Sequence, residues 1–368
     1  MNDVLTGLAQ RVRQAASSGA RLRIRGGQSK DYLCGASDAA PLDMRAYSGV
    51  VDYAPSELVV TARAGTPLVE LERMVAERGQ CLPFDPPRFG AAGAVLPGTV
   101  GGMVAAGLAG PGRAAVGGVR DFVLGALLLD GRGELLNFGG QVMKNVAGYD
   151  VSRLLAGSWG ALGAICEVSL KVLPMPPATL TLRFDMTQAD ALERLHAWAG
   201  QPLPLNASVW WRDTLALRLR GANAAVAAAA RTLGGEPIPG DLAAAFWEGL
   251  RDQRDEFFVE ARQAVAGGGR ALWRLSLPAT TPVLPAFDDT LVEWGGAQRW
   301  VLAAPDDTTL AAQAVRAGGS AVRVLGGSAG AGAYDPTPLP AALLAIQRRL
   351  RDSFDPQGVF VPGSLMTF

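Results

Sequence analysis

The sequence predicts an α+β fold, in which two α/β subdomains are followed by a domain built on an antiparallel sheet. Strand-like and helix-like segments alternate along most of the chain, and the run Pro174–Pro177 separates a glycine-rich part from a part with much less glycine. With 368 residues, 49% of them hydrophobic, the chain is long enough for two or three buried cores and too apolar to be disordered.

The part before Pro174 contains short strands and amphipathic helices. One helix is expected at the N-terminus, and another begins near Pro67 and ends at Gly79. The uncharged stretch Phe89–Pro111 is predicted to be a buried loop and strand region, because Pro97 and seven glycines interrupt it; a membrane span is the less favoured alternative. Strands are expected at 21–25, 58–62, 123–129, 134–138 and 164–172, and a further helix at 150–156.

The part after Pro177 repeats one order of elements twice. We expect strands at 179–184, 208–211, 214–220, 271–277, 291–294, 298–303 and 321–325, and helices at 188–199, 222–233 and 308–317. Two ferredoxin-like halves that share one antiparallel sheet explain this order. A last helix is expected at 339–353, before a tail rich in Pro and Gly.

Composition excludes several classes of function. The 34 basic and 34 acidic residues balance and form no block of one sign, which argues against a nucleic-acid partner or an anionic membrane surface. His196 is the only histidine, so no two-histidine metal site or acid–base pair exists. The three cysteines, Cys34, Cys81 and Cys166, form no CxxC motif. We therefore expect no metal site, reduced thiols and a cytoplasmic protein.

The first motif that suggests chemistry directly follows a predicted strand. Small residues there allow consecutive backbone N–H groups to point into one concavity, which suits a pyrophosphate. Neither a P-loop nor a Rossmann GxGxxG motif is present, and an ordinary turn is the alternative. The candidate residues are Arg25, Gly26, Gly27, Gln28, Ser29 and Lys30.

Two further motifs are rich in glycine. The segment 97–107 has few large side chains, which leaves room either for a flat ligand or for a tightly crossed loop. The segment 144–165 carries polar residues and then a glycine at every third position, and we predict that it contacts a ligand. The candidates are Gly98, Thr99, Gly101, Gly102 and Ala105 in the first segment, and Lys144, Asn145, Gly148, Tyr149, Gly157, Ser158, Gly160, Gly163 and Ile165 in the second.

Taken in order, these motifs resemble the FAD-binding domain of the vanillyl-alcohol oxidase family, the PCMH-type domain. That family has a phosphate loop like RGGQS, a segment like GTVGG, and a run like KNVAGYD followed by GSWGALGAI. The stretch 82–87, which includes Pro86, also matches, and FDPQGVFVPG (354–363) resembles the family's C-terminal return to the flavin. The pattern is most similar to that of FAD-binding subunits of glycolate oxidase (glycolate dehydrogenase).

The resemblance implies a role for each motif. Residues 26–29 would hold the pyrophosphate of FAD, Thr99, Gly101, Gly102 and Ala105 would line the flavin, and Gly160, Gly163 and Ile165 would lie at the adenosine end. Lys144, Asn145, Gly148 and Tyr149 would lie close to the site. The implied domains are 1–177 for FAD, 178–329 as a cap domain of the substrate-binding type, and 330–368 as a segment that returns to the FAD domain.

The sequence departs from the family at several positions. Gln28 stands where the phosphate loop has a third glycine, so it must adopt that backbone conformation without glycine's freedom. Ser29 stands where some relatives bind the flavin covalently through His, so we expect a dissociable, non-covalent FAD. Val361 and Ser364 replace an amide and a cation near the ring.

The catalytic residues stay unknown from the sequence. His196 is expected on a helix, as a solvated or hydrogen-bonded side chain rather than a catalytic one. Arg212 and Arg274 are expected on strands of the cap domain, where they would bind a substrate carboxylate or, as the favoured alternative, form surface ion pairs. No residue stands out as a general base.

The resemblance implies an FAD-dependent redox subunit that acts within a complex on glycolate or a related 2-hydroxy acid and yields glyoxylate. A catalytic FAD subunit and an iron–sulfur subunit would be its partners, because this chain has no cluster ligands of its own. Attachment to the inner membrane through that complex is left open. The alternatives are a structural subunit that is catalytically silent, and a stand-alone FAD-dependent oxidase of another 2-hydroxy acid.

Overall fold

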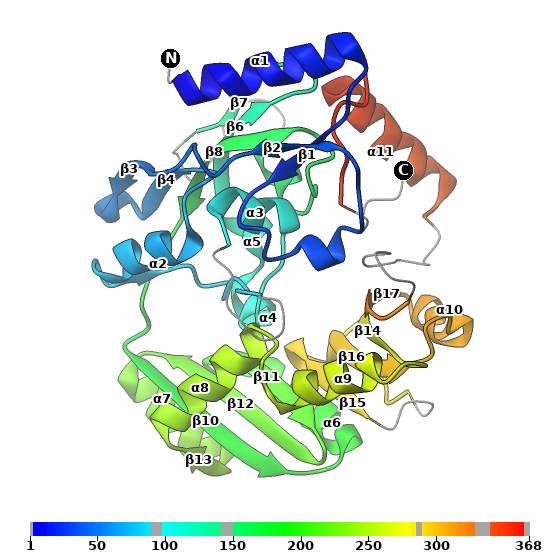
Figure 1. The fold of residues 1–368 in the computed structure, drawn as a ribbon. Coiled ribbons are helices and arrows are strands. Elements are labelled where there is room, and N and C mark those ends of the chain that lie inside the picture. Colours follow the sequence, from blue (N-terminus) through cyan, green and yellow to red (C-terminus); the bar gives the residue numbers. More distant parts are fainter. Residues whose placement is uncertain (1–2, 90–97, 141–149, 285–288, 328–338, 364–368) are drawn as a thin grey trace. The chain divides into compact units, whose positions relative to one another are not determined.

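The computed structural model describes residues 3–89, 98–140, 150–284, 289–327 and 339–363. The chain forms two units, labelled by element in Figure 1. Unit 1 consists of Met1–Ala109, Gly118–Met175 and Pro338–Phe368, and unit 2 of Gly110–Gly117 and Pro176–Thr337. The chain therefore enters unit 2 at the proline run, and it also makes an earlier excursion, Gly110–Gly117, that no sequence feature indicated.

Unit 1 contains a five-stranded sheet in which every neighbouring pair is antiparallel. Alternate side chains of its central strands enter two cores: Ala126 and Leu128 lie in one, and Leu129 lies in the other with Leu127 packed beside it. This explains the near-continuous apolar run of that strand. The order across the sheet is β3 (Val50–Ala54), β4 (Val59–Arg63), β8 (Ala164–Lys171), β6 (Val123–Leu129) and β7 (Leu135–Gly139).

Helices cover both of these cores. The predicted N-terminal helix is α1 (Asp3–Ser18), whose buried positions Leu5, Leu8, Val12 and Ala15 follow the helical spacing. The other core receives α2 (Leu68–Ala76) and α3 (Val100–Ala106). In the part of the chain that the structure describes, no helix is both long and apolar enough to cross a membrane.

The prediction of a loop and strand region for 89–111 is wrong for its described part, because α3 is a helix. Thr99 caps it by accepting a hydrogen bond from the Gly102 N–H (3.2 Å), and Gly107 ends it with φ +64°. Residues 90–97 of this stretch lie outside the described residues. The predicted helix at 150–156 is a 3-10 turn, η4 (Ser152–Leu155).

The C-terminal segment pairs with the start of the chain. Strand β1 (Leu22–Arg25) pairs in parallel with β2 (Ala40–Asp43). On its other side, the Leu22 N–H donates to the Val359 carbonyl (2.7 Å), and the Leu22 carbonyl accepts from the Val361 N–H (2.9 Å). The return follows helix α11 (Ala341–Phe354), so the last described residues complete the region around β1.

Asp355 holds the turn that makes this return possible. Its carboxylate is 2% exposed and accepts hydrogen bonds from the backbone N–H groups of Val359 and Phe360, both at 2.8 Å. The turn also packs against Gly131, where a side chain would collide with Asp355. Asp355 therefore connects α11, the return segment and the β6–β7 turn.

We predict that Asp355→Asn destabilises unit 1. An amide offers one acceptor oxygen in place of two, which leaves a buried N–H without a partner. The free energy of unfolding in urea should fall by about 1–3 kcal/mol. Asp352→Asn, at an exposed position of α11, is the control and should change it by less than about 0.5 kcal/mol. Equal effects of the two substitutions would contradict the role given to Asp355.

Unit 2 is built on one eight-stranded antiparallel sheet, and the predicted α+β class is confirmed. The first half runs β10, α6, β11, β12, α7, β13, and the second runs β14, β15, β16, α10, β17. Each half has the ferredoxin-like strand order, and the halves join through β11 and β15. The strands are β10 (Ala178–Asp185), β11 (Leu205–Trp211), β12 (Thr214–Gly221), β13 (Glu236–Ile238), β14 (Ala271–Ser276), β15 (Thr290–Glu293), β16 (Gln298–Ala303) and β17 (Ser320–Leu325).

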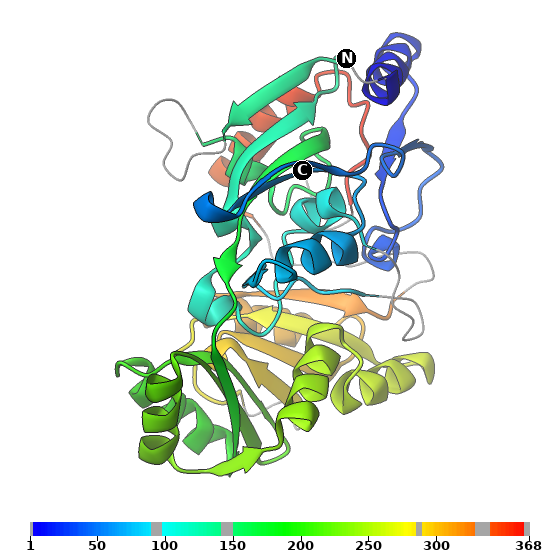
Figure 2. The ribbon, with the colours of Figure 1, turned by 90° about the vertical axis from the view of Figure 1, so that its left-hand side faces the viewer.

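Helices lie on both faces of this sheet (Figure 2). The predicted helices α6 (Gln188–Ala199), α7 (Asn223–Leu233) and α10 (Thr308–Arg316) pack against the face that carries the apolar clusters. Helices α8 (Gly240–Arg251) and α9 (Glu256–Ala266), which were not predicted, pack against the other face. There the Trp247 indole donates to the Thr181 hydroxyl (2.9 Å), and the Phe258 ring lies 4.9 Å from that of Trp300.

A buried carboxyl group lies under α9 on that second face. Glu293 accepts hydrogen bonds from Trp300 Nε1 (2.8 Å) and Gln298 Nε2 (2.9 Å). Burial, with a smaller contribution from the Asp255 carboxylate, raises its pKa to about 7, although the two hydrogen bonds and Arg274 act to lower the pKa. The group therefore holds its proton over a pH range in which an unfolded glutamate is ionised.

We predict a pH dependence of stability from Glu293. Since its pKa is raised on folding from 4.5 to about 7, the folded state binds the extra proton, and the free energy of unfolding falls as pH rises through this window. Glu293→Gln should reduce this pH dependence. The total contribution of Glu293 to the free energy of unfolding across the window is about 3 kcal/mol at most.

The measurement is urea unfolding at pH 5 and pH 8. Asp255, whose pKa burial raises to about 6, contributes with the same sign and stays in the variant, so the slope should diminish without vanishing. Glu193→Gln, at an exposed position of α6, is the control. An unchanged slope in Glu293→Gln would contradict the assignment.

Candidate functional site

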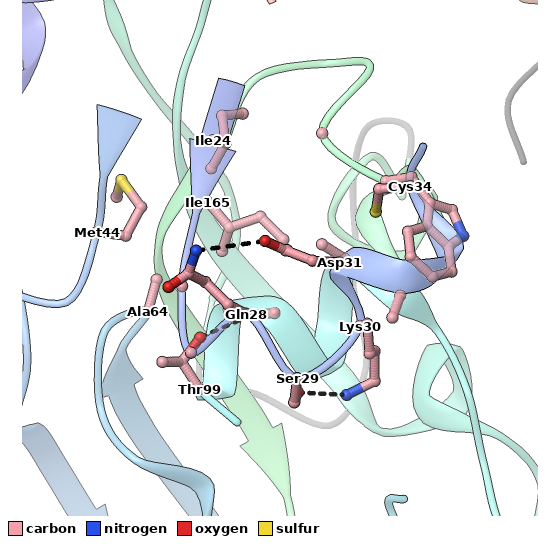
Figure 3. Close-up of a pocket in the computed structure, with 18 of the residues that line it drawn as sticks. Ile24, Gln28, Ser29, Lys30, Asp31, Cys34, Met44, Ala64, Thr99 and Ile165 are labelled. Atoms are coloured by element: carbon pink, nitrogen blue, oxygen red, sulfur yellow. Dashed lines mark hydrogen bonds between the residues drawn. The ribbon is translucent and has the colours of Figure 1, made fainter. Parts of the chain in front are cut away.

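Unit 1 contains a cavity at which the predicted motifs meet (Figure 3). Three stretches form most of its wall: the end of β1 with the loop that follows it, helix α3 with its cap, and the glycine turns that lead into β8. Met44 and Ala64 complete the wall. The lining residues are Ile24, Gly26, Gly27, Gln28, Ser29, Lys30, Asp31, Cys34, Met44, Ala64, Thr99, Gly101, Gly102, Ala105, Ala106, Trp159, Gly160, Gly163 and Ile165.

The loop after β1 presents unused backbone donors to this cavity. The β1–β2 pairing ends where the Met44 N–H donates to the Arg25 carbonyl (2.9 Å). The backbone N–H groups of residues 26–29 donate to no acceptor among the residues that the structure describes. Successive N–H groups in such a loop form an anion-binding nest. This observation fits the pyrophosphate of a dinucleotide.

Gln28 adopts the conformation that its place in the loop requires. Its φ is +59°, in the left-handed region where glycine is favoured. Its side-chain amide donates to Asp31 Oδ2 (3.3 Å), as Figure 3 shows. The backbone of the loop is therefore kept without the third glycine, and the amide is used within the protein.

The glycines of α3 serve two different purposes. A Cβ at Gly101 would lie 2.5 Å from that of Ala64, so this glycine allows the helix to pack on the end of β4. Gly102 has only the Thr99 hydroxyl nearby, 3.1 Å from a Cβ, and lines the cavity. A side chain at Gly26 would collide with Thr99. Tight packing and clearance for a ligand thus occur together in this segment.

Backbone conformation explains why glycine occupies every third position before β8. Gly157, Gly160 and Gly163 have φ values of +84°, +80° and +136°, which side chains rarely adopt. A Cβ at Gly163 would also lie 2.5 Å from the Leu129 carbonyl. The spacing therefore reflects successive left-handed turns that carry the chain past the cavity into β8.

Most of the predicted cofactor-binding residues lie together. On the cavity wall are Gly26, Gly27, Gln28, Ser29, Lys30, Thr99, Gly101, Gly102, Ala105, Gly160, Gly163 and Ile165. Off the wall are Arg25, Pro86, Gly98, Gly157 and Ser158. Lys144, Asn145, Gly148 and Tyr149 lie outside the described residues.

Two of the residues off the wall are close to it. A Cβ at Gly98 would lie 3.3 Å from Ser29 Oγ, and the Gly98 carbonyl accepts from the Leu68 N–H (2.8 Å), which holds the segment before α3. Arg25 has a buried Nε atom with no hydrogen-bond partner among the described residues. Pro86 is buried in the loop after β5 (Gln80–Cys81).

Sequence reasoning missed seven lining residues: Ile24, Asp31, Cys34, Met44, Ala64, Ala106 and Trp159. Four of them lie within or next to a motif that was found, so extending each motif by a few positions would have included Ile24, Asp31, Ala106 and Trp159. Met44 and Ala64 carry no local signal, because strand pairing and the approach of α3 bring them to the cavity.

The cavity carries little net charge from side chains. Among the described residues, Lys30 and Asp31 are the charged ones on its wall, and Lys30 Nζ lies 3.4 Å from Ser29 Oγ. Burial raises the pKa of the Cys34 thiol, against the influence of Arg23, so this thiol is protonated at neutral pH. An anion in this cavity would be stabilised mainly by backbone N–H groups.

The predicted candidates in unit 2 are engaged in contacts. His196 Nε2 is hydrogen-bonded to the Ala279 carbonyl (2.6 Å), which agrees with a satisfied histidine. Arg212 lies in the β11–β12 turn rather than on a strand, and it pairs with both oxygens of Glu260 (3.0 and 2.6 Å). Arg274 lies on β14 as expected, near Glu293.

Comparison with known proteins relates this geometry to a family. Residues 6–139 match the family described as FAD binding domain. Over 363 residues the chain is 43% identical to the glycolate oxidase subunit GlcE of Escherichia coli (strain K12), covering 99% of this chain and 97% of that protein.

More distant relatives share only part of the chain. The glycolate oxidase subunit GlcD of Bacillus subtilis (strain 168) is 30% identical over 39% of this chain and 29% of its own length. The D-2-hydroxyglutarate dehydrogenase of Xanthomonas citri pv. viticola is 28% identical over 53% of this chain and 39% of its own length. An alkyldihydroxyacetonephosphate synthase structure has the same fold, with a TM-score of 0.66 at 14% identity, over 96% of this chain and 74% of that one.

We predict that the left-handed conformation of Gln28 governs which side chains are tolerated there. Gln28→Val should lower the free energy of unfolding of unit 1 by about 1–2 kcal/mol, because a β-branched residue is strained at φ +59°. Gln28→Gly should leave it unchanged or higher. At Gln263, which is exposed on α9, the order should reverse, since glycine is the poorer helix former. The same order at both sites in urea unfolding would contradict this account.

Proposed function

Because the chain belongs to the family of the glycolate oxidase subunit GlcE, we propose that it is the FAD-binding redox subunit of a glycolate oxidase (glycolate dehydrogenase) complex. The complex would oxidise glycolate to glyoxylate and pass the electrons through the flavin to an iron–sulfur subunit. The observation that carries the proposal is the loop 26–29, which lines a glycine-rich cavity and whose backbone N–H groups have no acceptor among the described residues.

The residues of the cavity fit the parts of FAD. The nest 26–29 would bind the diphosphate, the first turns of α3 with Thr99 and Gly102 would lie beside the flavin, and Gly160, Gly163 and Ile165 would line the adenosine end. When bound, FAD supplies an acceptor for the hydride of a 2-hydroxy acid. The chain's own contribution is to bind the dinucleotide through neutral donors, to orient it against α3 and to exclude water from the covered part.

Binding of FAD is proposed to be non-covalent. Ser29 is 6% exposed and lies on the cavity wall, and a hydroxyl at this position offers no ring nitrogen or thiolate for a bond to the flavin. Cys34, the one cysteine on the wall, is held protonated by the burial that raises its pKa.

Partners are proposed because no general base has been identified among the described residues, and because the sequence has too few cysteines for an iron–sulfur cluster. His196 and Arg212 are engaged in contacts within unit 2, so His196 is not ready to take the proton of a substrate hydroxyl and Arg212 is not free to bind a substrate carboxylate. The three cysteines of the sequence lie far apart and cannot supply the thiolate set of an iron–sulfur cluster. A catalytic FAD subunit and an iron–sulfur subunit would provide these functions, and a peripheral location at the inner membrane would follow from the complex.

Two alternatives remain distinguishable by experiment. A silent structural subunit was suggested by Gln28, Val361 and Ser364, but Gln28 keeps the backbone that a phosphate loop needs. A stand-alone oxidase of another 2-hydroxy acid would react without partners.

We predict that the isolated chain binds FAD and is reduced slowly or not at all by glycolate. The purified chain should be yellow, with absorbance near 450 nm, and acid precipitation should release the flavin because no covalent bond holds it. After FAD is removed and rebound, anaerobic mixing with glycolate tests direct reduction. Gly26→Val, whose side chain would meet Thr99 in the cavity, is the matched variant and should bind FAD at least tenfold more weakly.

The outcomes distinguish the proposed redox subunit from the two alternatives. Rapid bleaching of the flavin by glycolate in the isolated chain would contradict the dependence on partners and favour the stand-alone oxidase. A colourless chain that does not rebind FAD would favour the structural subunit. Co-purification of untagged partners, with flavin and iron counted per complex, should give more than one flavin and several irons.

A further inference from the structure

Trp159 has a backbone conformation that is rare for its residue type. Its φ is +49°, between glycines at +84° (Gly157) and +80° (Gly160). Bulky side chains in the left-handed region are outliers that a protein keeps only where the surrounding structure holds them, often at ligand-binding sites. Glycine at position 159 would adopt this conformation without strain. The presence of tryptophan instead suggests that its side chain has a role.

Three contacts hold Trp159 in place. Its N–H donates to the Ala105 carbonyl on α3 (2.9 Å), and its carbonyl accepts from the Gly363 N–H (3.0 Å). A Cβ at Gly363 would lie 2.9 Å from the indole and 3.2 Å from Cys34 Sγ, so the ring rests directly on this backbone. Trp159 nevertheless stays half-buried and lines the cavity.

The surroundings of the indole differ from those of the phosphate loop. Among the residues that the structure describes, Trp159 is the one aromatic residue on the cavity wall. Next to it along the wall are Gly160, where a Cβ would lie 3.2 Å from Ile24 Cδ1, and Cys34, whose N–H donates to the Asp31 carbonyl (2.9 Å). The Asp31 carboxylate belongs to the phosphate loop, where it accepts from the Gln28 amide (3.3 Å). The wall at the indole is therefore formed by an aromatic ring, backbone and an apolar side chain, which suits the base of a nucleotide.

We propose that the indole of Trp159 stacks on the adenine ring of FAD and makes the cavity selective for the dinucleotide over FMN. The inference rests on the proposed function, since it takes FAD as the occupant of the cavity. Stacking of a base on a pre-positioned aromatic ring is favourable and needs no hydrogen-bond partner. The anchored backbone means that little conformational freedom of the indole is lost on binding.

The test uses the stripped full-length chain, titrated with FAD, ADP and FMN while tryptophan emission and binding are followed. ADP carries the adenine and the diphosphate but no flavin, and FMN carries the flavin but no adenine. FAD and ADP should quench emission of the wild-type chain. Trp159→Phe should remove this part of the quenching and keep the Kd for FAD within about threefold, because a ring remains.

Trp159→Leu should raise the Kd for both FAD and ADP by about tenfold or more and leave that for FMN unchanged. Trp294→Phe is the matched control: Trp294 also has a positive φ, +53°, and lies in unit 2 outside the cavity. It should keep both the quenching and the affinities. Circular dichroism and urea unfolding establish whether each variant is folded. If Trp159→Leu is not folded, the inference is tested by whether ADP still quenches the emission of Trp159→Phe as it does that of the wild type.

The outcomes separate this inference from the proposed function. If the stripped wild-type chain binds FAD, and Trp159→Leu binds FAD and ADP as tightly as the wild type, the inference is wrong and the proposed function stands. If Trp159→Leu weakens FMN binding and leaves ADP binding unchanged, the indole contacts the flavin and the inference is also wrong. If the wild-type chain binds neither FAD nor ADP, both fail.

Discussion

The close approach of the first turn of α3 to the end of β4 is the contact on which the site depends. Gly101 lies so near Ala64 that no side chain fits between them, and the Gly101 N–H donates to the Ala64 carbonyl (2.9 Å). The helix start is thereby fixed beside the loop after β1, where Thr99 lies against Gly26. The third motif is tied to the same helix, because its Trp159 N–H donates to Ala105.

Backbone conformation supplies most of what the site needs. The proposed anion-binding loop offers backbone N–H groups, the turns before β8 are glycines with positive φ, and among the described residues only Lys30 and Asp31 bring charged side chains to the wall. This explains how a chain with equal numbers of acidic and basic residues can form a site for a doubly charged dinucleotide. It also explains why Gln28 replaces a glycine without loss of the loop: what is required is a dihedral angle, and glutamine reaches it.

Much of the fold could be predicted because its signals are local. In unit 2, alternating strands and helices with clear ends predicted the ferredoxin-like halves, and the sheet order bears them out. Helix α3 was missed because two glycines lower its intrinsic helix propensity, while the Thr99 cap and packing on Ala64 stabilise it. Helices α8 and α9 were missed in a stretch that was left unassigned.

The site could be predicted to a similar extent, and for a related reason. Its three motifs are short, and each keeps its own conformation, so each could be recognised from neighbouring residues. Met44 and Ala64 became part of the wall only through strand pairing and helix packing across the chain. Arg212 was expected on a strand and lies in a turn, where its pairing with Glu260 depends on a helix, α9, that was not predicted.

The division of the chain has a consequence for how the protein is made. Unit 2 consists of an early piece, Gly110–Gly117, and a long later piece, and unit 1 is completed only by residues after 337. The early piece is held in unit 2 by Trp294, whose indole donates to the Gly110 carbonyl (3.1 Å). During synthesis, unit 2 is therefore complete before β1 can receive its C-terminal partner at 359–361. The cavity wall next to β1 therefore gains this support only after the strands and helices of unit 2 have been synthesised.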